Sequence, residues 1–94
     1  MGKRDVSHDA GLPVPLHWFR PGEGAHPSPV PAGHVVTGQN DQHAHMKVPA
    51  GSPLRVGDMV GFGISHPCTT FDKWQVLYLV DDDHTVTGAI RTYF

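Results

Sequence analysis

The chain has 94 residues, of which 38% are hydrophobic, so it can form one small domain with a thin core. Its formal net charge of −2 argues against nucleic acid or an anionic membrane as the main partner, and its apolar runs are too short to span a membrane. The single cysteine, Cys68, excludes an internal disulfide framework and favours a reducing, cytoplasmic compartment. Histidine, the commonest metal ligand, occurs eight times, which is unusually often for this length.

Period-two alternation between proline- and glycine-rich turns predicts short β-strands, and no ten-residue stretch has a helical period. After an extended stretch over residues 1–13, the expected strands cover residues 14–20, 34–38, 43–48, 59–65, 73–80 and 85–94. Residues 21–33 carry four prolines and three glycines, a composition that excludes a helix or a central strand and predicts a long surface loop. The pattern predicts an all-β domain, a small β-barrel or sandwich.

His66 and Cys68 form the sharpest constellation of reactive side chains. In an extended chain, residues two apart project to the same side, and imidazole and thiolate are both good zinc ligands. Two ligands leave coordination positions open, which suits catalysis or a shared interface better than a structural site. The alternative is a buried cysteine beside a hydrogen-bonded histidine.

Three further clusters have both a chemical and a purely structural interpretation. His43 and His45 share one strand face and could join the metal, or they could line a polar face in solvent. The acidic run 81–83 could bind a hard cation such as calcium, or form a solvated hairpin tip. Gly61 and Gly63 leave one strand face bare, which permits close approach of a backbone or ligand, unless that face packs inside a closed barrel.

A complete active site is not evident in the sequence. No glycine-rich phosphate loop leads into a helix, and no serine lies in a nucleophile elbow. None of the three lysines, Lys3, Lys47 and Lys73, has a context that predicts a Schiff base. We therefore expect the chain to lack catalytic activity by itself.

The segment HPCTTFDKW, from His66 to Trp74, resembles the zinc-site segment of the D-serine dehydratase-like family, which includes bacterial amino acid deaminases and is related to D-threonine aldolases. The opening GKRDVS with Asp9, Gly11, Leu12 and Pro13 is similar to the segment where that family's chain enters its C-terminal domain. The segments QNDQH (39–43), VGD (56–58) and AIRTYF (89–94) resemble the family as well, so the likeness extends over essentially the whole chain.

The resemblance implies that residues 1–94 are the C-terminal β domain of an alanine-racemase-like two-domain enzyme, without its N-terminal barrel. In that family the barrel carries pyridoxal phosphate and its lysine, so no cofactor-binding residue is expected in this chain. The resemblance assigns His66 and Cys68 as zinc ligands, and His43 as a catalytic residue at the active-site mouth. Cysteine at position 68 resembles the dehydratase branch, whereas aldolases tend to have aspartate there.

The implied reaction converts D-serine to pyruvate and ammonia, with zinc and pyridoxal phosphate as cofactors. The expected partner is the barrel domain of the same or a second subunit, in a homodimer at full length, docked on the faces of Gly61/Gly63, His43/His45 and His66–Cys68. Two alternatives remain open: a domain of a D-threonine aldolase-type lyase, and a free-standing, non-catalytic β module.

Overall fold

The computed structural model describes residues 1–23 and 26–93, and their regular secondary structure is almost entirely β-strand. In chain order the elements are β1 (Val14–Phe19), β2 (Ser28–Pro29), β3 (Val35–Gln39), β4 (Ala44–Lys47), β5 (Met59–Gly63), α1 (Cys68–Lys73), β6 (Val76–Val80) and β7 (Val86–Arg91). The prediction of a small all-β domain is confirmed. No helix in this described part is long and apolar enough to cross a membrane.

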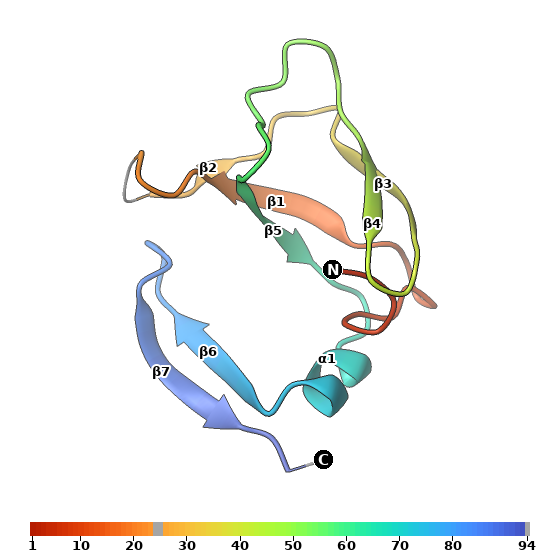
Figure 1. Cartoon of the computed structure of the whole chain (residues 1–94), viewed down its shortest axis with the longest axis vertical. Coiled ribbons are helices and arrows are strands. Elements are labelled where there is room, and N and C mark those ends of the chain that lie inside the picture. Colours follow the sequence, from red (N-terminus) through yellow and green to blue (C-terminus); the bar gives the residue numbers. More distant parts are fainter. Residues whose placement is uncertain (24–25, 94) are drawn as a thin grey trace.

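The strands form three antiparallel sheets (Figure 1). The largest has the order β2-β1-β5, and the other two are the hairpins β3-β4 and β6-β7. A closed barrel is not formed within the described residues, so the barrel form of the prediction is wrong. The described strands form separate ladders instead.

The long proline-rich loop contributes one short edge strand, β2. Its residues pair with the middle of β1, where His17 lies opposite Pro29, and the Val30 N–H donates to the Leu16 carbonyl at 2.9 Å. Proline is tolerated here because an edge strand has one row of backbone groups that needs no partner. The prediction that this segment is no helix and no central strand is therefore confirmed for residues 21–23 and 26–33, while residues 24–25 lie outside the described part.

Helix α1 occupies residues that were expected to be extended, so the predicted strand 73–80 begins only at Val76. Pro67 precedes the helix with φ −88° and ψ 2°, and its carbonyl accepts the Phe71 N–H at 3.2 Å. Proline suits this position because it has no N–H to leave unpaired and its φ is already helical. Six residues are too few to show a helical period in the sequence.

The buried side chains lie in the first 39 residues. Val6 and Val36 are the buried hydrophobic residues among those described, with Asp5, His34 and Gln39 as buried polar neighbours. His34 is satisfied on both ring nitrogens, by the Pro31 carbonyl at 2.8 Å and by the Ser52 hydroxyl at 2.7 Å. This core is as thin as the composition predicts.

An ion pair closes the end of the β1–β5 ladder. The Arg20 guanidinium donates to both carboxylate oxygens of Asp58, Nε to Oδ1 at 2.8 Å and Nη2 to Oδ2 at 2.9 Å, and its carbon lies 5.1 Å from the Trp18 ring centroid. The hydrogen bonds from Arg20 hold the pKa of Asp58 below its ordinary value, and the same contact raises the pKa of Arg20. Bidentate geometry of this kind fixes orientation as well as charge.

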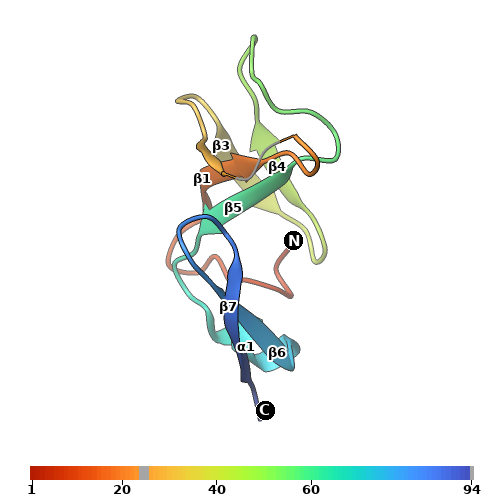
Figure 2. The same ribbon diagram turned by 90° about the vertical axis from the view of Figure 1, so that its left-hand side faces the viewer.

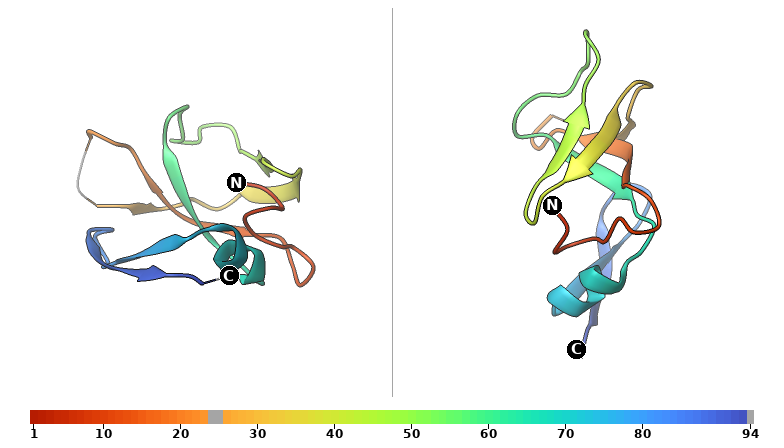
Figure 3. Two further views of the ribbon diagram at one scale, coloured as in Figure 1. Left: turned by 60° about the horizontal axis from the view of Figure 1, so that its bottom comes forward. Right: turned by 90° about the vertical axis from the view of Figure 1, so that its right-hand side faces the viewer.

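The β6–β7 hairpin lies at the opposite end of the molecule from β3 and β4 (Figures 2 and 3). Its turn is held by Asp81, whose carboxylate accepts the backbone N–H groups of Asp83 at 2.9 Å and Thr85 at 3.0 Å. Both faces of the hairpin carry exposed apolar side chains, with Tyr78 69% and Val86 57% exposed. The acidic run is thus a hairpin tip whose first carboxylate is used by the turn itself.

Candidate metal site

The N-terminal segment lies along the stretch between β5 and α1, and so joins parts of the chain that are far apart in sequence. Ser7 forms an isolated antiparallel bridge with His66, and the Ser65 hydroxyl donates to the Gly11 carbonyl at 2.8 Å. The Thr70 hydroxyl, on α1, donates to the Asp5 carbonyl. These contacts bring the side chain of Asp9 to His66.

The side chains of His66 and Cys68 meet at the start of α1, with Nε2 of the imidazole 2.8 Å from Sγ. The two side chains meet as predicted, but the predicted cause, an extended backbone, was wrong. Cys68 is the first residue of a helix and not part of a strand. The turn at Pro67 brings the two side chains together instead. Cys68 is exposed and His66 is half-buried, so the thiol is open to a ligand.

Asp9 holds the other nitrogen of the His66 ring. Its two carboxylate oxygens lie 2.9 and 3.1 Å from Nδ1, and the Ser7 hydroxyl donates to Oδ1 at 2.8 Å. The hydrogen bond from His66 is the main reason that the pKa of Asp9 is lowered, and the bond from Ser7 adds to it. A carboxylate accepts, so Nδ1 carries the proton and Nε2 directs its lone pair towards the sulfur.

The Nε2 atom of His66 and the Sγ atom of Cys68 are placed so that they could bind one zinc ion. In a tetrahedral zinc site a histidine nitrogen and a cysteine sulfur are about 3.5 Å apart, given metal distances of about 2.0 and 2.3 Å. The present separation of 2.8 Å needs an opening of about 0.7 Å, which rotation of the exposed Cys68 side chain supplies.

His66 and Cys68 are the two side chains that the described residues offer as ligands at this site. Across residues 1–23 and 26–93, no group of three or more histidine, cysteine, aspartate or glutamate side chains is arranged to hold a metal ion. Asp9 is occupied with Nδ1, on the far side of the imidazole from the sulfur. Water, substrate or another chain would have to complete a coordination shell at His66 and Cys68.

The other two predicted site histidines, His43 and His45, make no hydrogen bond or ion pair with His66 or Cys68 among the described residues. His43 precedes β4 and is exposed, and its backbone carbonyl accepts the Asn40 N–H at 2.8 Å. His45 is exposed on β4, on the face opposite to that of half-buried Ala44 and Met46. Of the hydrogen bonds and ion pairs made by the described residues, none joins the side chain of His43 or His45 to the His66–Cys68 pair.

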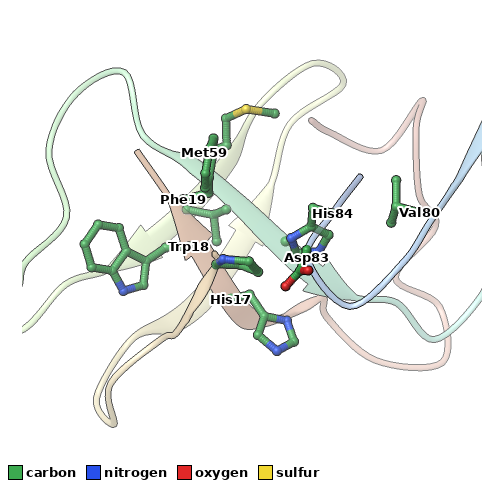
Figure 4. A pocket seen from close by; sticks show the side chains of 10 residues that line it. His17, Trp18, Phe19, Met59, Val80, Asp83 and His84 are labelled. Atoms are coloured by element: carbon green, nitrogen blue, oxygen red, sulfur yellow. The ribbon is translucent and has the colours of Figure 1, made fainter. Parts of the chain in front are cut away.

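An apolar pocket of about 360 Å³ lies elsewhere, between β1, β5 and the tip of the β6–β7 hairpin (Figure 4). Its lining comprises His17, Trp18, Phe19, Pro27, Met59, Val60, Gly61, Val80, Asp83 and His84. Gly61 lines this pocket, and a Cβ there would lie 3.9 Å from the His17 carbonyl oxygen, whereas a Cβ at Gly63 would lie 3.2 Å from the Leu16 side chain that covers it. Since His66, Cys68 and His43 are absent from this lining, the pocket is separate from the candidate metal site.

The residues present do not fit pyridoxal phosphate. All three lysines are exposed, and none of them lines the pocket. A Schiff-base lysine needs a desolvated or electrostatically tuned site, and a phosphate needs a cradle of N–H groups or cations. The pocket offers mainly aromatic and aliphatic surface.

Sequence reasoning missed Asp9 and Ser7 as members of the site. Residues 1–13 suggested only an extended stretch, with turn chemistry around Asp9. The available signal was the resemblance of this same opening segment, including Ser7 and Asp9, to a known family. Their partner, His66, is 57 residues away from Asp9 along the chain.

Comparison with known proteins identifies the chain's relatives at the level of a family. Residues 1–80 match the protein family described as "Putative serine dehydratase domain". The matched region includes Ser7, Asp9, His66 and Cys68, and it ends with β6. A search of the curated proteins gives no match.

Proposed function

The chain belongs to the serine dehydratase domain family, and on this premise we propose that it is the metal-binding C-terminal domain of a pyridoxal-phosphate-dependent D-serine dehydratase. In this proposal His66 and Cys68 hold zinc. The observation that carries it is the contact between Nε2 and Sγ, 2.8 Å apart at an exposed site. A soft thiolate beside a neutral imidazole is a donor pair that zinc prefers.

The proposed chemistry starts from a poor leaving group, the β-hydroxyl of D-serine. When bound, zinc supplies a Lewis acid that stabilises negative charge on that oxygen. Cys68 supplies the charged ligand, and the exposure of its side chain leaves room for a substrate. His66 supplies a nitrogen lone pair whose direction is fixed from behind by Asp9.

Pyridoxal phosphate and its lysine would come from the N-terminal barrel domain, in the same or a second subunit, with a homodimer as the proposed full-length assembly. The neighbouring exposed apolar residues Tyr78, Leu79 and Val80 of β6 support a partner surface, because exposed apolar area beyond scattered single residues marks interaction sites. His43 would line the mouth of the shared active site, where its exposure leaves it accessible. A reducing cytoplasm, the proposed location, would keep Cys68 as a free thiol.

The activity test uses the 94-residue chain itself. We expect no pyruvate from D-serine above a heat-killed control, even with pyridoxal phosphate and zinc added, because no lysine here has a cofactor site. Pyruvate production by the purified chain would contradict the assignment as an incomplete, metal-binding domain.

The metal test is a calorimetric titration of the chain with zinc. We expect one weak site, because two protein ligands leave half of a tetrahedral shell to water. Cys68→Ser and His66→Ala should each weaken binding at least about tenfold, since each removes a ligand. His45→Ala is the matched control, an exposed histidine outside the pair. Equal affinity in all four proteins would overturn the metal role of His66 and Cys68.

An aldolase-type lyase is the second candidate for the whole enzyme, and the thiol at position 68 favours the dehydratase over it. The discriminating assay compares D-serine with D-threonine as substrates of the full-length protein. Release of pyruvate from D-serine supports the dehydratase. Cleavage of D-threonine to glycine and acetaldehyde, without pyruvate from D-serine, supports the aldolase.

A further inference from the structure

We propose that Asp9 is a positioning residue of the metal site, which orients His66 from the side opposite the metal and fixes its tautomer. This inference rests on the proposed function of His66 and Cys68 as metal ligands. It adds a residue of the N-terminal segment to the site. Asp9 makes its contact through the imidazole and not to the metal.

The geometry of the carboxylate sets the role. Both oxygens of Asp9 lie within hydrogen-bond distance of Nδ1, at 2.9 and 3.1 Å, so the ring donates its proton there whichever way the carboxylate turns. The opposite nitrogen, Nε2, then presents its lone pair on the side of Cys68, where it can accept the thiol S–H or bind a metal. A carboxylate behind a metal-binding histidine raises the basicity of the ligand and holds the plane of its ring.

Asp9 is itself held in place by its neighbours in the segment. The Ser7 hydroxyl donates to Oδ1 at 2.8 Å, and the backbone of Ser7 bridges to that of His66. Beyond Asp9, the Gly11 carbonyl accepts the Ser65 hydroxyl at 2.8 Å. The N-terminal segment is therefore attached to residues 65–66, between β5 and α1, on both sides of Asp9.

Asp9 is open to substitution without loss of the fold. Its side chain is 62% exposed, and its contacts go to His66 and Ser7 rather than to the core. Asp9→Ala removes the acceptor, whereas Asp9→Asn keeps one acceptor oxygen and removes the charge. Asp82→Ala, at the exposed hairpin tip, is the matched control because it removes a carboxylate far along the chain from the site.

The test is a titration of the chain with Co²⁺, followed by the near-ultraviolet absorption of a thiolate bound to cobalt. We expect Asp9→Ala to weaken binding about 10- to 100-fold, the usual loss when the partner behind a ligating histidine is removed. Asp9→Asn should lose less of the Co²⁺ affinity, and Asp82→Ala should bind Co²⁺ as tightly as the wild-type chain. The absorption band should keep its position in Asp9→Ala, since Cys68 still binds.

The outcomes separate this inference from the proposed function. If the wild-type chain binds Co²⁺ and Asp9→Ala binds it equally well, the positioning role is overturned and the metal site stands. If the wild-type chain shows no thiolate–cobalt band, the metal site at His66 and Cys68 and the positioning role of Asp9 are both overturned. Nitrogen NMR of His66 in the metal-free chain gives an independent readout: we expect the Nδ1–H tautomer in the wild type, and an Nε2–H tautomer would overturn the role of Asp9.

Discussion

The body of the molecule, residues 1–63 with β1 to β5, differs sharply from the β6–β7 hairpin in how its side chains are covered. The buried residues described above all belong to the body, including Val6 and Val36. The hairpin has no buried residue between Val76 and Arg91, and β6 and β7 pair with each other in a separate two-stranded sheet. The candidate metal site lies at the junction, where the N-terminal segment of the body meets the start of α1.

This contrast teaches that the two parts are held by different forces. In the body, burial is supplemented by specific polar contacts such as the Arg20–Asp58 pair. The hairpin is held by the backbone pairing of β6 with β7 and by the Asp81 turn. A two-stranded hairpin of this kind is at best marginally stable alone in water. We therefore expect the body and the hairpin to respond differently to the same kind of substitution.

The largest effect should come from Asp58→Asn, which removes the charge and one acceptor oxygen from the Arg20 pair. The loss of stability at pH 7 should exceed that of every other variant below. Since the folded pKa of Asp58 lies below its ordinary value of 3.8, the unfolded chain binds more protons in that range. The stabilisation is thus complete above the ordinary value and is lost as the pH falls through the folded value.

Thermal unfolding at pH 7 and pH 3 checks this prediction. The wild-type chain should lose more stability on acidification than Asp58→Asn, which has no such carboxylate to protonate. A parallel loss in the two proteins would show that the pair contributes little to the stability of the body.

The second effect is the loss of a core side chain. Val36→Ala should lower the free energy of unfolding by about 2 kcal/mol, because Val36 is only 3% exposed and two buried methyl groups are removed. Val35→Ala, on the next residue and 53% exposed, is the control and should change it by less than about 0.5 kcal/mol. Similar losses in a denaturant titration would mean that β3 buries its other face.

The third effect tests the attachment of the N-terminal segment. A Cβ on Gly2 would lie 2.5 Å from three backbone atoms of the turn between β3 and β4, so Gly2→Ala should cost about 1 kcal/mol or more and weaken the metal site that the segment supports. Gly38→Ala is the control, since nothing lies within 4 Å of its would-be Cβ. Unchanged stability and cobalt affinity in Gly2→Ala would show that the segment is not needed.

The smallest effect is expected in the hairpin. Tyr78→Ser should change the free energy of unfolding by less than about 0.5 kcal/mol, because the side chain is 69% exposed and covers no core. The measurement is the same denaturant titration, repeated at two protein concentrations. A loss as large as that of Val36→Ala, growing with concentration, would show that the hairpin face is covered by a second copy in solution.

The strands could be predicted from sequence because alternation and turn residues are local signals. The observed β1 and β4 lie within residues 14–20 and 43–48, and the glycine-rich segment 59–65 contains β5. Helix α1 was missed because its six residues include two threonines, and threonine is a better strand former than helix former. The departure begins at Pro67, whose fixed φ starts the turn.

The candidate site could be predicted only in part. His66 and Cys68 are two residues apart, so their meeting is a local property of the chain, although the turn and not a strand produces it. Asp9 reaches His66 only because Ser7 and Gly11 pair with the segment at residues 65–66, and such long-range pairing leaves no local pattern in the sequence. The exposure of the hairpin is likewise a property of the whole fold, because its alternation is that of an ordinary half-buried strand.

The central claim is that His66 and Cys68 share one metal ion, and X-ray absorption on the zinc-loaded chain tests it most directly. We expect one sulfur at about 2.3 Å and one imidazole nitrogen at about 2.0 Å from zinc, with oxygen in the remaining positions. The sulfur should vanish in Cys68→Ser. A wild-type spectrum with oxygen and nitrogen neighbours but no sulfur would contradict the claim.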